Sequence, residues 1–146
     1  MKKTVKLPEN FFLGAAASAW QTEGWSEKKE SQDSYIDLWY KENKNVWHNG
    51  YGPAVATDYY HRYKEDIAYM KEIGMNCYRT SLNWSRFLTD YENIVVDEEY
   101  ANYYDKMLDE LIAQGIEPMV CLEHYEIPAE LFKKYVINDT QCDEDT

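Results

Sequence analysis

The stretch that decides the fold runs from Asp58 to Leu82, DYYHRYKEDIAYMKEIGMNCYRTSL. Aromatic and apolar residues recur in it at the spacing of one helix face: Tyr59, Tyr63, Ile67 and Met70. Thr57 or Asp58 is expected to cap the start of this helix, and Gly74 to end it. The next residues, Met75–Leu82, have the length and composition of a strand. The stretch therefore predicts one helix followed by one strand.

The same order recurs further along the chain. A second helix is predicted from a stripe of apolar residues, Tyr100, Tyr104, Met107, Leu108 and Leu111. Asp97 is its expected cap and Gly115 its expected stop, and Ile116–Leu122 follows as a strand. Neither strand alternates strictly with polar residues, which predicts strands covered on both faces. Phe11–Ala17 is an earlier strand candidate, and a further helix is expected from about Pro128.

Alternating strands and helices predict an α/β fold with right-handed connections and parallel strands. The segment 21–56, between the first strand and the first helix, is too long for a routine connection. It is rich in aromatic residues: Trp25, Tyr35, Trp39, Tyr40, Trp47 and Tyr51. Long ordered loops at the carboxyl ends of strands are where α/β proteins place their sites. We therefore expect this segment to lie beside the functional site.

Composition narrows the classes of partner. The chain has 146 residues, with 15 Lys and Arg against 27 Asp and Glu, so its net charge is −12. Such an acidic chain repels nucleic acid and anionic membranes, so neither is an expected partner. No apolar run approaches the roughly 18 residues of a membrane span. The sequence leaves the oligomeric state open.

Three cysteines, an odd number without metal-ligand spacing, favour a reduced compartment. Cys77 and Cys121 lie in apolar runs and are expected to be core residues, with Cys142 the third. A basic start before an apolar run superficially resembles a signal peptide, but the polar residues 6–10 separate the two. We therefore expect a cytoplasmic protein.

Polar and aromatic residues gather after each of the three predicted strands. They are Gln21 and Glu23, then Arg79, Asn83 and Trp84, then Glu123, His124, Tyr125 and Glu126. If the strands are parallel neighbours, these residues meet at one edge of the sheet. Amides, imidazole, carboxylates and aromatic rings together suit a polyhydroxylated ligand.

Plainer interpretations stand beside this one. His124 alone is more often a structural hydrogen-bonding residue, and Gln21 and Glu23 could be solvated loop residues. Arg79 within an apolar strand needs a partner, and a structural ion pair would serve as well as a functional one. Trp84 is by default a core residue. No nucleotide-binding glycine motif, serine elbow or zinc spacing is present, so no cofactor or metal is predicted.

Three blocks of sequence resemble family 1 glycoside hydrolases. They are FLGAAASAWQTEG (Phe12–Gly24), DYYHRYKEDIAYMKEIGMNCYRTSLNWSR (Asp58–Arg86) and YYDKMLDELIAQGIEPMVCLEHYEIPAEL (Tyr103–Leu131). The resemblance implies a (β/α)8 TIM barrel, of which this chain would be the N-terminal part, about three β/α units and incomplete as a barrel. The roughly 200 residues that a closed barrel needs exceed the length of the chain. The resemblance also implies a retaining β-glycosidase.

The resemblance assigns roles to particular positions. Gln21 and His124 match family residues that hydrogen-bond the hydroxyl groups of the glycone, and Tyr125 replaces a frequent Trp near it. Arg79 matches the arginine that lies beside the nucleophilic carboxylate and keeps it ionised. Glu23 matches a motif glutamate that we expect to be structural.

The finer resemblance is to the 6-phospho-β-glucosidase branch. HNGYGPAVATDYYHRYKEDI (His48–Ile67) and the run His124-Tyr125-Glu126 carry it, because plain β-glucosidases usually have an aromatic residue and Asp after that His. The implied substrate is a small β-glucoside, 6-phosphorylated. A β-glucosidase or β-galactosidase acting on unphosphorylated sugar is the alternative. A non-catalytic sugar-binding product or a non-functional truncated product is another.

Both catalytic carboxylates of the family are missing from the sequence. Retaining hydrolysis needs two carboxylates about 5 to 5.5 Å apart. The family takes them from an Asn-Glu-Pro-like and a Glu-Asn-Gly-like motif, and neither occurs in these residues. We therefore assign no catalytic residue here and predict no turnover by the chain alone. Residues 1–135 are expected to form the barrel portion, and 136–146, which resemble nothing in the family, a disordered tail.

Overall fold

A computed structural model describes residues 4–137 of the chain. The first elements are β1 (Gly14–Ala16), α1 (Ala19–Thr22), the short helical turns η1 (Glu30–Gln32), η2 (Lys44–Val46) and η3 (His48–Gly50), and between η1 and η2 the helix α2 (Tyr35–Glu42). They are followed by α3 (Tyr59–Glu72), β2 (Cys77–Ser81), α4 (Trp84–Phe87), β3 (Leu88–Asp90), β4 (Val95–Val96), α5 (Glu98–Ala113), β5 (Glu117–Cys121), α6 (Ala129–Leu131) and the π-helical turn η4 (Phe132–Ile137).

The main sheet has three parallel strands in the order β1-β2-β5. Ala16 pairs with Arg79, and Arg79 pairs with Met119, so all three strands end at the same edge. The predicted parallel α/β order is confirmed. The small antiparallel pair β3–β4 after α4 was not predicted, because its strands are too short to leave a periodic pattern.

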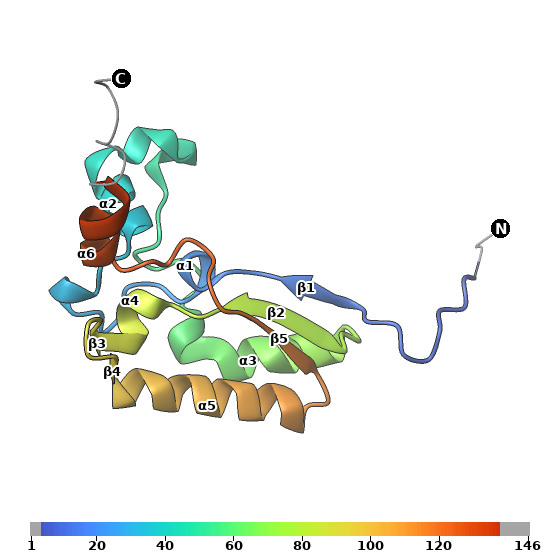
Figure 1. Cartoon of the computed structure of the whole chain (residues 1–146). Coiled ribbons are helices and arrows are strands. Elements are labelled where there is room, and N and C mark those ends of the chain that lie inside the picture. The colour runs from blue at the N-terminus through green and yellow to red at the C-terminus, as the bar shows by residue number, and fades with distance from the viewer. Residues whose placement is uncertain (1–3, 138–146) are drawn as a thin grey trace, which may run out of the picture.

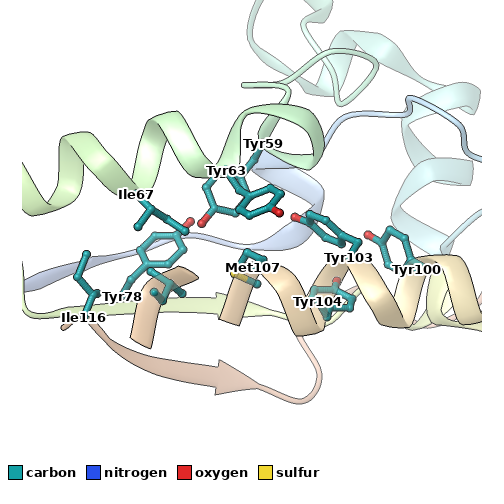
Figure 2. Close-up of a cluster of buried hydrophobic side chains, with 10 residues drawn as sticks. Tyr59, Tyr63, Ile67, Tyr78, Tyr100, Tyr103, Tyr104, Met107 and Ile116 are labelled. Atoms are coloured by element: carbon teal, nitrogen blue, oxygen red, sulfur yellow. The ribbon is translucent and has the colours of Figure 1, made fainter. Parts of the chain in front are cut away.

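Helices α3 and α5 lie on the same side of the sheet, as Figure 1 shows. Their facing sides and β2 form the core, which is built largely of tyrosines: Tyr59, Tyr63, Ile67, Tyr78, Tyr100, Tyr103, Tyr104, Met107, Leu111 and Ile116. Figure 2 shows side chains from both helices pointing toward one another over the sheet. Both predicted helix stripes are thus buried, because the 3.6-residue period places them on one face.

The two long helices begin differently. Asp97 caps α5, since its carboxylate accepts a hydrogen bond from the Tyr100 N–H at 3.2 Å, as predicted. Asp58 holds the capping position of α3 in the left-handed region, with φ 55°, and its side chain makes no capping hydrogen bond. Gly74 and Gly115 follow the two helices with positive φ, which fits their predicted role as stops.

Two predictions about the strands are wrong. The first strand is shorter than Phe11–Ala17, and its residues Gly14–Ala16 are exposed. β2 is covered on both faces, but β5, which lies at the edge of the sheet, is not: Met119 and Val120 are both more than a third exposed. Cys121 is accordingly half-buried and not a core residue, whereas Cys77 is buried.

The long segment 21–56 is ordered and contains helix α2, which was not predicted. It is joined to the segment after β5 by an antiparallel bridge between Ser34 and Pro128. The ring of Tyr35 stacks on that of Phe132 at a centroid distance of 4.5 Å. Helices α2 and α6 therefore lie together beyond the carboxyl ends of the strands (Figure 1).

Other expectations concern membrane spans and the two ends of the chain. Within residues 4–137, no helix combines the length and apolarity needed to cross a membrane. Cys142 and almost all of the predicted tail 136–146 lie outside the described residues. The expected boundary at residue 135 stays a prediction.

Candidate glycone-binding site

The alternation of β2 directs its side chains to two different surroundings. Tyr78 belongs to the core beneath α3 and α5, so Arg79 and Ser81 face the opposite side of the sheet. Both of these residues contact the segment that follows β5, namely residues 122–128. The carboxyl edge of the sheet is therefore where the predicted site residues converge.

Arg79 and His124 are in direct contact. Nη2 of Arg79 lies 3.3 Å from Nδ1 of His124, and Nη1 donates to the carbonyl oxygen of Ala17 at 3.3 Å. The contact joins the ends of β1 and β2 to the turn after β5. Among the residues that the structure describes, no carboxylate forms a salt bridge with Arg79, so the structural ion pair considered from sequence is absent there.

Tyr125 is held in an uncommon conformation next to this pair. Its φ is +71°, a region that aromatic residues rarely adopt. Its N–H donates to the Glu123 carboxylate at 2.7 Å, and its ring lies 5.2 Å from His124 and 6.4 Å from Tyr35 between centroids. More than half of its side-chain surface is exposed. The turn therefore presents the Tyr125 ring to solvent beside His124.

Gln21 lies on α1 and is exposed. It lines an open hollow with Trp20 and with Tyr51, Gly52, Pro53 and Ala56 of the long segment. The preceding N–H, of Trp20, donates to Oε1 of Glu126 at 3.2 Å. Gln21 therefore directly follows a residue that is hydrogen-bonded to the segment that carries His124. No hydrogen bond joins Gln21 to His124 among the described residues.

Glu126 is the buried carboxyl at the centre of this edge. Its side chain is fully buried, and Oε1 accepts hydrogen bonds from the Ser81 hydroxyl at 2.8 Å and from the Trp20 N–H. Oε2 has no hydrogen-bond partner. Burial raises the pKa of Glu126 to about 7, and the two hydrogen bonds oppose this only in part. Sequence reasoning placed Glu126 in the polar cluster but gave it no role.

Glu23, in contrast, belongs to the interior. Tyr100 donates to Oε2 and Tyr104 donates to Oε1 at 2.9 Å, with Arg86 near enough to favour the ionised form. Burial nevertheless raises the pKa of Glu23. This setting fits the structural role expected of Glu23.

Asp37 is a further polar centre that sequence reasoning missed. Its carboxylate accepts hydrogen bonds from Trp20 Nε1 at 3.0 Å, Trp25 Nε1 at 2.9 Å and Lys28 Nζ at 2.6 Å. It also closes a capping box with Ser34 at the start of α2. The spacing Ser34-x-x-Asp37 is the signal that could have predicted both the helix and this residue.

Two other expectations can be placed on the structure. Trp84 is half-buried, and its indole N–H donates to the Leu122 carbonyl oxygen, so it fastens β5 to α4. Within the described residues, no group of three or more His, Cys, Asp or Glu side chains has an arrangement that could hold a metal ion.

The family model described as Glycosyl hydrolase family 1 matches residues 3–140. The chain belongs to glycosyl hydrolase family 1. It is 38% identical over 128 residues to 6-phospho-beta-glucosidase GmuD of Bacillus subtilis, covering 88% of this chain and 27% of that protein. It is 39% identical over 131 residues to Beta-glucosidase 24 of Oryza sativa subsp. japonica, covering 89% of this chain and 26% of that protein. The chain thus spans about a quarter of the length of these relatives.

Solved structures of the family agree with the fold. An AHE enzyme from Alicyclobacillus herbarius superposes with a TM-score of 0.80 at 29% identity, covering 92% of this chain and 29% of that one. The psychrophilic beta-glucosidase BglU from Micrococcus antarcticus gives 0.78 at 33% identity, covering 88% and 27%. The three parallel strands are therefore the N-terminal β/α units of a (β/α)8 barrel, as predicted.

Proposed function

We propose that this chain supplies the glycone-binding side of a retaining β-glycosidase site. The observation that carries the proposal is the contact between Arg79 and His124 at the carboxyl edge of the sheet, in a chain of this family. The carboxyl ends of barrel strands are where enzymes of this fold place their chemistry. Gln21 and His124 bind glycone hydroxyls in this proposal, and Tyr125 covers the sugar ring.

Arg79 serves the nucleophile in the same proposal. Its guanidinium is half-buried and bonds a backbone carbonyl and an imidazole, which leaves its positive charge without a counterion among the described residues. A carboxylate placed next to it would be kept ionised, because a nearby opposite charge lowers the pKa of an acid. The family motifs that supply the catalytic carboxylates do not occur in this sequence.

A turnover assay tests whether the chain binds the glycone without catalysing hydrolysis itself. Purified chain is incubated with nitrophenyl 6-phospho-β-glucoside, and we expect no release of nitrophenol, because retaining hydrolysis needs both carboxylates. Release that disappears in His124→Ala would show that the chain is itself catalytic.

The substrate is proposed to be a 6-phospho-β-glucoside, and the protein to be cytoplasmic. Similarity to GmuD and the run His124-Tyr125-Glu126 support the phosphorylated substrate. The odd number of cysteines, without metal-ligand spacing, supports the location. Beta-glucosidase 24 is equally similar, which favours unphosphorylated β-glucoside as a second candidate. Calorimetric titrations of the chain with cellobiose 6-phosphate and with cellobiose decide between them by the ratio of the two dissociation constants.

A further inference from the structure

We propose that Glu126 is a positioning residue that fastens the three strand ends of the glycone site to one another. The inference rests on the proposed function, but its geometry is independent of any ligand. Oε1 of Glu126, from the segment after β5, accepts from Ser81 Oγ at the end of β2 and from the Trp20 N–H at the start of α1. Ser81 Oγ in turn accepts from the Ala19 N–H at 2.8 Å.

This network joins the segments that carry the predicted ligand-binding residues. Gln21 follows Trp20, Arg79 is two residues before Ser81, and His124 is two residues before Glu126. One carboxyl oxygen therefore connects the three segments within a single set of hydrogen bonds. Loss of that oxygen would remove the direct side-chain link between α1 and the segment after β5, while the backbone hydrogen bonds between the strand ends remain.

The backbone just before Glu126 is strained, at Tyr125. Tyr125 has a φ of +71° and is exposed, whereas the next residue, Glu126, is fully buried. Such strain persists only where the surrounding structure requires it, and it concentrates at functional sites. The Tyr125 N–H bond to Glu123 holds the turn in this form.

The unpaired oxygen argues against packing as the only role of Glu126. Oε2 is buried without a partner, and buried polar atoms without partners are rare in proteins. A residue with one acceptor would serve the two hydrogen bonds without that penalty. The negative charge of Glu23, near the end of α1, also raises the pKa of Glu126. Tyr35 of α2 lies near enough for Glu126 to raise the pKa of its hydroxyl. Conversion of the carboxyl between its two protonation states near neutral pH therefore changes the strength of the network.

Amide exchange and pH titration of the ligand-free, ¹⁵N-labelled chain test the proposal. In Glu126→Ala we expect the amides of Trp20 and Ala19 to exchange at least about tenfold faster, the factor for losing a hydrogen bond to a charged group. Glu126→Gln retains an acceptor and should keep the slow exchange. Glu117→Gln, which changes an exposed carboxylate at the opposite end of β5, is the matched control and should leave these amides unchanged.

The titration separates positioning from simple packing. Between pH 5 and 9 the Trp20 amide of the unchanged chain should shift with a midpoint near that of Glu126, about 7. The shift should vanish in Glu126→Gln. A cellobiose titration of the same samples reports sugar binding separately. Unchanged exchange in Glu126→Ala, a Trp20 shift that survives in Glu126→Gln, or a chain without dispersed amide signals would each overturn the proposal. Failure of cellobiose binding alone would contradict the proposed function and not the positioning role.

Discussion

Strands β2 and β5 arise from similar sequence and end in different surroundings. Each follows a helix and a glycine, and each is a short apolar run. β2 lies between two strands and beneath two helices, and four of its five residues are buried. β5 is an edge strand with none of its residues fully buried. The sequence pattern of a strand indicates whether its faces are suited to burial. Whether they are buried depends on the elements that pack against the strand.

The largest difference between the two strands is expected when a buried side chain of β2 and an exposed side chain of β5 are each replaced by alanine. Tyr78→Ala on β2 removes a nearly fully buried ring and should lower the free energy of unfolding by about 3 to 5 kcal/mol. Met119→Ala on β5 removes a side chain that is 38% exposed, so we expect a loss below about 1 kcal/mol. Urea denaturation of both variants measures the difference. Equal losses would show that β5 is as well packed as β2.

Glu126→Gln tests the polar edge shared by the two strands. Because burial raises the pKa of Glu126 to about 7, its contribution to stability is fully present below the unfolded pKa, near 4.5, and is lost as pH rises through 7. Glu126→Gln should therefore be no more stable than the original at pH 4, and more stable by up to about 3 kcal/mol at pH 8.

Denaturant titrations at pH 4, 6 and 8 measure this pH dependence. The difference between variant and original isolates Glu126 from the other titrating groups. Glu117→Gln, which changes an exposed carboxylate at the opposite end of β5, should show no comparable trend. A difference that does not change between pH 4 and 8 would mean that the pKa of Glu126 is the same in the folded and the unfolded chain, near 4.5, and would contradict this prediction.

A smaller effect compares the helices that precede the two strands. Asp97→Ala before β5 removes a side-chain cap and should cost about 1 to 2 kcal/mol. Asp58→Gly before β2 removes no capping bond and relieves a positive φ, so we expect it to be neutral or slightly stabilising. Thermal unfolding of the two variants measures both changes, and a larger loss in Asp58→Gly would contradict this account.

Much of the fold followed from periodicity. Tyr59, Tyr63, Tyr100 and Tyr104 lie in the core because a helix stripe fixes which face is buried, and Asp97 caps α5 because its position before the stripe was clear. The cover of β5 could not be predicted, because it depends on neighbours and not on the strand. Helix α2 was missed because an aromatic-rich segment was interpreted as loop.

The position of the site could be predicted from the sequence, but its hydrogen-bond network could not. Parallel strands bring their carboxyl ends together, so the meeting of Arg79 and His124 followed from the topology. The burial of Glu126 did not follow, because it depends on the backbone turn at Tyr125, whose positive φ has no signal in a non-glycine residue. Roles for Gln21, His124, Tyr125 and Arg79 came from family resemblance and stay predictions.

Calorimetric titration of the chain with cellobiose 6-phosphate, and in parallel with cellobiose, tests the central claim most directly. The account predicts a heat of binding that is abolished in both Gln21→Ala and His124→Ala. Glu117→Gln, at the opposite end of β5, should bind as the original does. Absence of binding in the folded chain, or binding that survives both alanine substitutions, would contradict the claim that these strand ends form the glycone side of the site.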